Sequence, residues 1–327
     1  MRRRRFVCGE RPVRRRKLSR PTHTPKHKNR SGALLASVPV ILVAVGLWLR
    51  PVSVFNGYSY LRVWLTGGQS RSVTVHGFRI HYDVLGPIDA PVVVLVHGLG
   101  GHAEDWQNMS PYLVAAGHRV YLLDLPGFGR SEKPSDFSYS VQDQAAVVSA
   151  FLESLELKRV DLGGWSMGGW IVQLAAFQHP ERVRKLVLID SAGLKEAPTW
   201  NTNLFAPTTV AELDQLEALL TPHPASIPDF IARDIVRISR KNSWVTHRAL
   251  RTMLTGQDTT DSLLPQLKMS VLIVWSADDE IFPLSQGRRM HALVPQSQLE
   301  VVSGCGHLVV IQCASQIGLK VASFVNQ

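Results

Sequence analysis

The sequence contains few cysteines and, outside its first residues, little excess of charge of either sign. Three cysteines in 327 residues cannot form a dense disulfide framework, and their spacing fits no zinc ribbon or zinc finger. Residues 1–30 hold 13 of the 36 Lys and Arg side chains and a single acid, Glu10, whereas the rest of the chain carries 23 basic and 25 acidic side chains. The body is therefore almost neutral, which argues against a nucleic-acid-binding domain.

The sequence also lacks a P-loop, a dinucleotide-binding glycine motif and a cluster of metal ligands. We therefore expect neither a cofactor nor a metal. The chain is 45% hydrophobic, which is enough to bury a full core in one large domain or two small ones. Nothing in the sequence indicates the oligomeric state.

The first fifty residues differ in composition from the rest. Residues 1–30 are rich in Arg, Lys, Pro and His, which predicts a disordered basic tail. Residues 31–50 include the uncharged run Ala33–Leu49, which as a helix would be about 25 Å long and nearly span a bilayer core. We expect a single-pass membrane anchor, with the positively charged N-terminus in the cytoplasm and the catalytic domain outside. A cleaved signal peptide and a buried core helix are the alternatives.

Residues 51–71 are expected to form a juxtamembrane segment. Val54, Tyr58, Leu61 and Leu65 follow one another at spacings of four, three and four, which predicts a helix with one apolar face. That face could lie in the membrane interface or pack on the main domain, and the sequence leaves both possibilities open.

From residue 72 to residue 327, apolar runs typical of strands alternate with stretches of helical periodicity. Residues 72–76 and 78–84 form a predicted hairpin. The further expected strands are 92–96, 120–123, 160–162, 186–189, 271–275 and 299–302, and the expected helices are 141–155, 167–178, 284–293 and 309–325. This alternation predicts an α/β fold with a mostly parallel sheet and helices on both faces.

One stretch interrupts the alternation. About 80 residues between Ile189 and Val271 contain no convincing strand. Helical segments are expected instead at residues 209–220, 228–240 and 243–254, separated by prolines. Because a loop of this length would be improbable, we expect an inserted helical cap at about residues 194–268.

A serine lies in a glycine-rich turn between an expected strand and an expected helix. The run from Gly164 to Gly168 reads G-W-S-M-G, with Ser166 at its centre. Such a turn holds a serine hydroxyl clear of the sheet, and the helix N-terminus behind it offers free N–H groups. Ser166 is therefore the predicted nucleophile, although a glycine-rich turn without catalytic function would look similar.

A serine nucleophile needs a general base and an acid that orients the base. His307 follows the last expected strand, and Asp279 follows the strand before it, so both lie at carboxyl ends where sites in such sheets gather. The order Ser166, Asp279, His307 is the one expected of a serine hydrolase with an α/β sheet. Asp190, at the end of another strand, is the reserve candidate for the acid.

A second glycine-rich loop, His97 to Gly101, ends the strand at residues 92–96. Its flexible glycines let a backbone N–H point at a developing oxyanion, so the N–H groups of Leu99 and Met167 are the predicted oxyanion hole. His97 is expected to brace this loop.

These motifs together resemble the α/β-hydrolase superfamily over residues 73–325. The segments that carry the resemblance are His97–Gly101, Asp124–Ser131, Gly164–Gly169, His179–Val183, Asp279–Pro283 and Gly306–His307. Within the superfamily, the chain looks most like membrane-anchored monoacylglycerol-lipase-like esterases and meta-cleavage-product hydrolases. Epoxide hydrolases and haloalkane dehalogenases carry aspartate at the nucleophile position, and Ser166 argues against both.

Two positions depart from the family pattern. Ser276 stands where glycine is usual, and Gln312-Cys313 replaces a common Glu-Pro. Neither change removes a catalytic group. Cys305 and Cys313 are not expected to pair, because one precedes His307 in a loop and the other lies in an expected helix.

The sequence thus predicts a serine esterase that hydrolyses carboxylic esters through an acyl-enzyme. An apolar cap and a membrane anchor favour a lipid-like substrate, such as a monoacylglycerol or a medium-chain ester, delivered from the bilayer. A carbon–carbon bond hydrolase of the meta-cleavage-product type is the alternative enzyme. A catalytically inactive, membrane-tethered binding protein is the alternative without chemistry.

Overall fold

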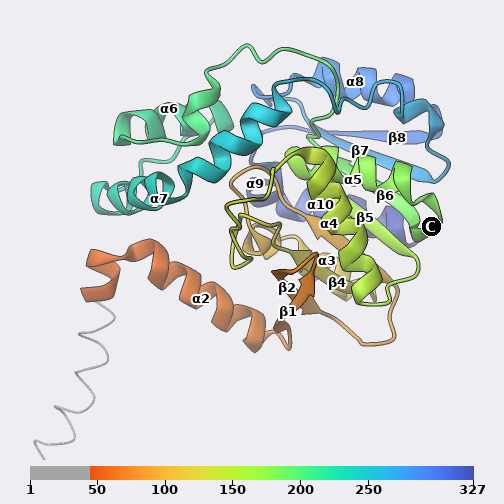
Figure 1. Ribbon diagram of the computed structural model, residues 1–327, viewed down its shortest axis with the longest axis horizontal. Coiled ribbons are helices and arrows are strands. Elements are labelled where there is room, and N and C mark those ends of the chain that lie inside the picture. Colours follow the sequence, from red (N-terminus) through yellow and green to blue (C-terminus); the bar gives the residue numbers. More distant parts are fainter. Residues whose placement is uncertain (1–44) are drawn as a thin grey trace, which may run out of the picture. The chain divides into compact units, whose positions relative to one another are not determined.

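The computed structural model describes residues 45–327 (Figure 1). Its strands are β1 (Gln69–Val75), β2 (Phe78–Leu85), β3 (Val92–Val96), β4 (Arg119–Leu123), β5 (Val160–Trp165), β6 (Val183–Ile189), β7 (Ser270–Ser276) and β8 (Ser297–Val302). Its α-helices are α2 (Pro51–Leu65), α3 (Ser110–Ala115), α4 (Val141–Ser154), α5 (Met167–Gln178), α6 (Val210–Leu220), α7 (Asp229–Met253), α8 (Leu284–Leu293), α9 (Val309–Gln312) and α10 (Ala314–Val325).

All eight strands form one sheet in the order β1-β2-β4-β3-β5-β6-β7-β8. The hairpin β1–β2 and the pairing of β2 with β4 are antiparallel, and every later pairing is parallel. The expected α/β fold with a mostly parallel sheet is therefore confirmed. Because the parallel strands all run in one direction, their carboxyl ends meet at one edge of the sheet, where the predicted site residues follow.

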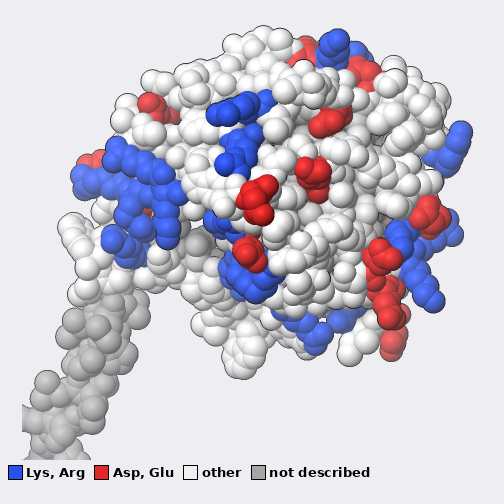
Figure 2. Space-filling view, viewed as in Figure 1, with Lys and Arg blue, Asp and Glu red and all other residues white. Residues whose placement is uncertain are grey.

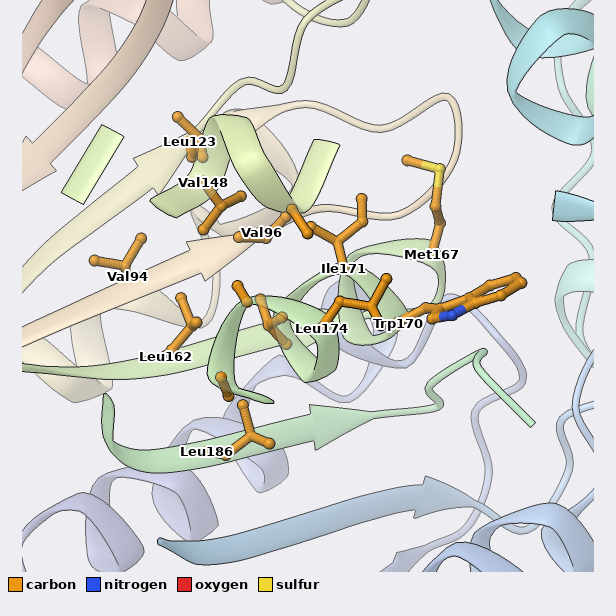
Figure 3. Packing of buried hydrophobic residues seen from close by; sticks show 14 of the residues in the cluster. Val94, Val96, Leu123, Val148, Leu162, Met167, Trp170, Ile171, Leu174 and Leu186 are labelled. Carbon is orange, nitrogen blue, oxygen red and sulfur yellow. The ribbon is translucent and has the colours of Figure 1, made fainter. Parts of the chain in front are cut away.

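The core has two layers, one on each face of the sheet. Along β3, Val94 and Val96 join one apolar cluster, while Val93 and Leu95 join the other. This alternation is the period of two expected when both faces of a strand are buried. Figure 3 shows the first layer, in which Ile171 and its neighbours from α4 and α5 pack against the strands. The second layer is formed with α3, α9 and α10.

The helices differ from the expected ones at three places, the first being α3, which was not predicted from the sequence. The segments expected at 228–240 and 243–254 are one continuous helix, α7, because the residues between them include no proline or glycine. The helix expected at 309–325 is divided at Cys313 into α9 and α10. Between β6 and β7 the chain thus contains α6 and α7, in the stretch where a cap was expected.

Helices α6 and α7 pack on each other through a small apolar cluster centred on Leu213, Ala232 and Val236. The N-terminus of α6 is held by a capping box, in which Thr209 and Glu212 accept each other's backbone N–H groups. Arginines of α7 project into solvent, and Figure 2 shows Lys and Arg side chains gathered at the end of the molecule that Figure 1 assigns to α7.

The predicted localisation, a single-pass membrane protein with the catalytic domain outside the cytoplasm, is contradicted. Within residues 45–327 no helix combines the length and the apolar composition that crossing a bilayer requires. Helix α2 has 15 residues, including Arg62, whereas a spanning helix needs about 20 apolar residues. The tail predicted at 1–30, and the anchor predicted at 31–50 up to residue 44, lie outside the described residues.

Helix α2 contacts the rest of the domain, but not through the apolar face that the sequence predicted. Tyr58, Leu61 and Leu65 of that face are exposed, and the buried residues of the helix are Pro51, Ser59 and Val63. The Val52 N–H donates to a carboxylate oxygen of Asp234 in α7 at 3.1 Å. Farther along α2, the Ser59 carbonyl accepts a hydrogen bond from Gln107 at 3.1 Å. These contacts tie the helix to α7 at one end and to the segment before α3 at the other.

Candidate active site

Ser166 occupies a strained turn between β5 and α5. Its φ of 56° and ψ of −122° lie where side chains other than glycine are rarely found. A Cβ at Gly164 would lie 2.3 Å from the Gly168 carbonyl oxygen, and a Cβ at Gly168 would lie 2.2 Å from the Val96 carbonyl oxygen. The two glycines therefore let the backbone fold tightly enough to present the serine hydroxyl above the sheet.

The structure brings the three predicted catalytic side chains together. His307 Nε2 lies 2.8 Å from Ser166 Oγ, and His307 Nδ1 lies 2.7 Å from Asp279 Oδ2. Asp279 Oδ1 accepts the N–H groups of Ile281 at 2.7 Å and Phe282 at 3.0 Å, which fixes the carboxylate. All three side chains are buried. The arrangement is that of a nucleophile, a base and an orienting acid.

Two aromatic residues hold His307 in place. The Trp165 indole N–H donates to the His307 carbonyl oxygen at 2.9 Å, although the two residues are 142 positions apart in the sequence. The Phe282 ring meets the imidazole edge to face at 5.4 Å between centroids. The G-W-S-M-G run thus supplies both the serine and a support for the base, a second role for Trp165 that the motif alone does not reveal.

The loop from His97 to Gly101 lies directly against the serine turn. A Cβ at Gly98 would lie 3.1 Å from the Ser166 Cβ. His97 Nδ1–H donates to the Gly98 carbonyl at 2.7 Å, and its Nε2 accepts the Leu125 N–H at 3.1 Å, so the ring braces the loop. Complete burial lowers the pKa of His97 and keeps it neutral. Leu99, the predicted oxyanion donor, lines the same cavity as Ser166.

Met167, the other predicted oxyanion donor, is the first residue of α5. Because the first N–H groups of a helix have no intrahelical acceptor, its N–H is free to bind a ligand oxygen, and the helix dipole favours negative charge there. The position suits the charge that develops on a carbonyl oxygen when the neighbouring serine attacks.

Asp190, the reserve candidate, lies beside the acid that contacts His307. One oxygen each of Asp190 and Asp279 and one nitrogen of His307 lie within 4.8 Å of one another. Asp190 Oδ1 accepts the Ser276 N–H at 2.7 Å, and its Oδ2 is buried without a hydrogen-bond partner among the described residues. Burial, reinforced by the Asp279 carboxylate, raises the pKa of Asp190 well above its usual value. Burial and the neighbouring Asp279 carboxylate thus both favour the protonated form of Asp190.

The expectation that Cys305 and Cys313 do not pair is wrong, because the structure joins them in a disulfide. The helix expected to continue through Cys313 instead breaks there, which turns this side chain toward the loop that holds Cys305. Spacing alone does not reveal the pair, since the break in the helix decides it.

The serine opens into an apolar cavity of about 230 Å³. Its lining includes no Lys or Arg within the described part of the chain; its one charged residue is Asp105, apart from the site residues. A second cavity of about 320 Å³ shares Gly100, Phe205 and Leu216 with the first and continues between α6 and α7. The second cavity is lined by His102, Glu104 and Lys133 as well as by apolar side chains of α6 and α7, so the two cavities together can hold a substrate with both apolar and polar parts.

Comparisons with known proteins agree with this geometry. The sequence model of a family described as the alpha/beta hydrolase fold matches residues 91–313. A 2-hydroxy-6-oxononadienedioate/2-hydroxy-6-oxononatrienedioate hydrolase of Cupriavidus pinatubonensis is 29% identical over 79% of this chain and 96% of its own length. A Bacillus subtilis protein named Uncharacterized hydrolase YugF is 30% identical over 78% of this chain and 97% of its own length. The crystal structure of a membrane phospholipase A, called a novel bacterial virulence factor, has a TM-score of 0.77 and 26% identity over 90% of this chain and 98% of that one.

Proposed function

Because the chain belongs to the alpha/beta-hydrolase family and is a hydrolase, we propose that it cleaves carboxylic esters by way of a serine acyl-enzyme. Ser166 is the nucleophile, His307 the general base and Asp279 the acid that orients it. The stretch at about residues 194–268 serves as a cap that shapes the substrate cavity. The short contacts of His307 with both partners support these roles.

The reaction proceeds in two steps. His307 Nε2 takes the Ser166 proton as the hydroxyl attacks the ester carbonyl, and the oxyanion accepts hydrogen bonds from the Leu99 and Met167 N–H groups. His307 then protonates the departing alcohol, which leaves an acyl group on the serine. In the second step His307 activates water, which releases the acid. Removal of one oxyanion donor typically costs about 3 kcal/mol in the barrier.

The observation that carries the choice of a neutral ester is the charge of the cavity. Its described lining offers no Lys or Arg to pair with a substrate carboxylate, and its one acidic residue, Asp105, is paired with His102 at 3.1 Å. Apolar side chains such as Leu216, Leu220 and Ile311 suit an acyl chain. We therefore expect a lipid-like ester, such as a monoacylglycerol or a medium-chain ester.

Hydrolysis of a carbon–carbon bond is the second candidate, and the comparisons support it as well as the first. The Cupriavidus relative, which aligns over nearly its whole length, is named for such a reaction. Its name denotes substrates with two carboxylates. Among the described residues, the lining of the cavity beside Ser166 has no Lys or Arg to receive them, and Lys133 lines only the adjoining cavity.

Substrate comparison separates the two candidates. We expect kcat/KM to be higher for p-nitrophenyl octanoate and a monoacylglycerol than for a 2-hydroxy-6-oxo-dienedioate. From acetyl to octanoyl esters it should rise up to about fourfold per methylene that reaches the cavity. A flat or falling series, together with turnover of the dienedioate, would put the carbon–carbon hydrolase first.

The nucleophile is tested by replacing Ser166. The Ser166→Ala variant should lose ester turnover by about 10⁴-fold or more, because no other group can form the acyl-enzyme. It should also fail to react with a fluorophosphonate probe. Ser149→Ala, in α4 and remote from the site, is the control and should keep both properties. Normal turnover by the Ser166 variant would refute the mechanism.

A further inference from the structure

We propose that the disulfide between Cys305 and Cys313 positions His307, so that reducing it lowers the catalytic rate while leaving substrate binding largely intact. The proposal rests on the proposed function, in which His307 is the general base. Cys305 lies two residues before His307 and Cys313 six residues after it. The bond therefore closes a short loop around the base.

The loop has little regular structure of its own. It runs from the end of β8 at Val302 to the start of α9 at Val309. Gly304 adopts a φ of +83°, and Gly306 stands directly before the histidine. Gly306 packs closely against the end of α6, where a Cβ would lie 2.5 Å from the Leu220 carbonyl oxygen. This contact, the Trp165 indole N–H and the Phe282 ring already act on His307, and the disulfide adds a covalent constraint to them.

The disulfide joins this loop to a rigid part of the fold. Cys313 precedes α10, whose Ile317 and Val321 are fully buried in the second apolar layer. Cys305 is fully buried as well, and its carbonyl oxygen accepts a hydrogen bond from the Ser276 hydroxyl. The disulfide thus fixes the loop that carries His307 to a helix whose position is set by packing.

The loop also meets the end of α6. The Leu308 N–H donates to the Leu220 carbonyl at 3.3 Å, and the Gln312 side chain donates to Thr221 Oγ1 at 2.8 Å. Without the covalent bond, the loop would be held by these contacts, by the Trp165 indole N–H on the His307 carbonyl and by the Ser276 hydroxyl on the Cys305 carbonyl. A displacement of about 1 Å in a catalytic group can cost about 10²-fold in rate.

Reduction has a simple stoichiometry. A dithiol reagent donates two electrons and two protons; the S–S bond breaks, two thiols form, and the reagent becomes a cyclic disulfide. The remaining cysteine, Cys8, lies outside the described residues. It contributes one thiol in both redox states and so calibrates a thiol titration. The oxidised protein, once denatured, should show one thiol, and the reduced protein should show three.

The experiment compares the full-length enzyme before reduction, after it and after reoxidation. On reduction we expect kcat for p-nitrophenyl octanoate to fall by about 10- to 100-fold, with KM changed by less than about twofold. The rate of fluorophosphonate labelling at Ser166 should fall by a similar factor, and reoxidation should restore both. Three thiols in the unreduced protein, or equal kcat before and after verified reduction, would overturn the proposal.

Variants separate positioning from loss of stability. Cys305→Ala/Cys313→Ala should have the kcat of the reduced enzyme and no response to the reagent. Val148→Ala, a truncation in the other apolar layer, should lower the melting temperature while keeping the kcat of the oxidised wild-type enzyme and the same fall in kcat on reduction. If oxidised wild-type enzyme neither hydrolyses esters nor reacts with the probe, the proposed function fails. If it does both and reduction changes neither, only this inference fails.

Discussion

Two carboxyl groups approach the same histidine but have opposite surroundings. Asp279 is stabilised as a carboxylate by the Ile281 and Phe282 N–H groups, whereas Asp190 has one buried oxygen with no partner in the described chain. Two carboxylates this close repel each other, so ionising both costs free energy and one carboxyl group keeps its proton. The raised pKa of Asp190 assigns that proton to Asp190.

This difference predicts unequal effects of the same substitution. Asp279→Asn should lower kcat by about 10³- to 10⁴-fold at pH 7, because the amide favours the wrong histidine tautomer. Asp190→Asn should keep kcat within about threefold, since asparagine is a neutral isostere of the protonated acid. Both are measured by steady-state kinetics with an activated ester. A larger loss at Asp190 than at Asp279 would reverse the assignment of the acid.

The three proposed catalytic residues could be predicted from the sequence, because their positions depend on local sequence motifs and on the direction of the strands that precede them. Ser166 was recognisable from its glycines, and His307 and Asp279 from their places after buried strands, since parallel strands deliver their carboxyl ends to one edge. The proximity of Asp190 to Asp279 and the pairing of Cys305 depend on distances between elements. Such distances are decided by packing, which a single sequence does not display.

Helix α7 illustrates the same limit for a secondary-structure element. Its strong helical periodicity was recognised, but a boundary was placed between residues 240 and 243, where the structure has none. Without proline or glycine there, the continuous helix keeps all its hydrogen bonds. The break in the helix at Cys313 was not predicted, because no residue next to Cys313 is one that typically ends a helix.

The continuity of α7 can be tested at Lys241, an exposed residue in its middle. Lys241→Pro should lower the free energy of unfolding by about 3 kcal/mol, because proline removes the hydrogen bond to the Arg237 carbonyl and clashes with it. Lys241→Ala is the matched control and should be nearly neutral. Urea unfolding measures both variants. Equal stability of the two would favour separate helices.

Away from the site, the domain buries an ionic pair that links the hairpin to the loop after β4. His81 Nδ1 lies 2.7 Å from Asp124 Oδ2, and Asp124 Oδ1 accepts the Ala103 N–H at 2.6 Å. Burial opposes charge on both groups, yet the hydrogen bond to His81 holds the pKa of Asp124 at about 2. The Asp124 and Asp83 carboxylates outweigh burial and raise the pKa of His81.

The pair predicts how stability depends on pH. The depressed pKa of Asp124 gives about 2 kcal/mol that is present above pH 4 and lost as the pH falls toward 2. The raised pKa of His81 gives stability that is present below about pH 6.5 and lost as the pH rises through its folded value. When the free energy of unfolding is measured with urea across this range, the contribution of the pair should therefore be largest between about pH 4 and 6.5. His81→Gln should be less stable there and should lose less on acidification; an unchanged profile would contradict this.

The architecture as a whole was predictable because hydrophobic periodicity and strand–helix alternation extend over the domain. The expected α/β sheet and its antiparallel hairpin both occur in the structure. The predicted localisation is contradicted because no helix within residues 45–327 is long and apolar enough to cross a bilayer. Helix α2, the described element nearest that run, finds its partners within the domain.

The docking of α2 on α7 has a consequence for the order of events during synthesis. Val52 and its acceptor Asp234 are 182 residues apart, and the Trp48 ring stacks on Phe230 of the same helix. At about 5–20 residues per second, the ribosome needs roughly 10 to 40 s to make the intervening chain. During that interval α2 has left the exit tunnel without its partner helix. An element made early thus completes its native contacts late, and Phe55, Tyr58 and Trp64 of α2 stay exposed even when those contacts have formed.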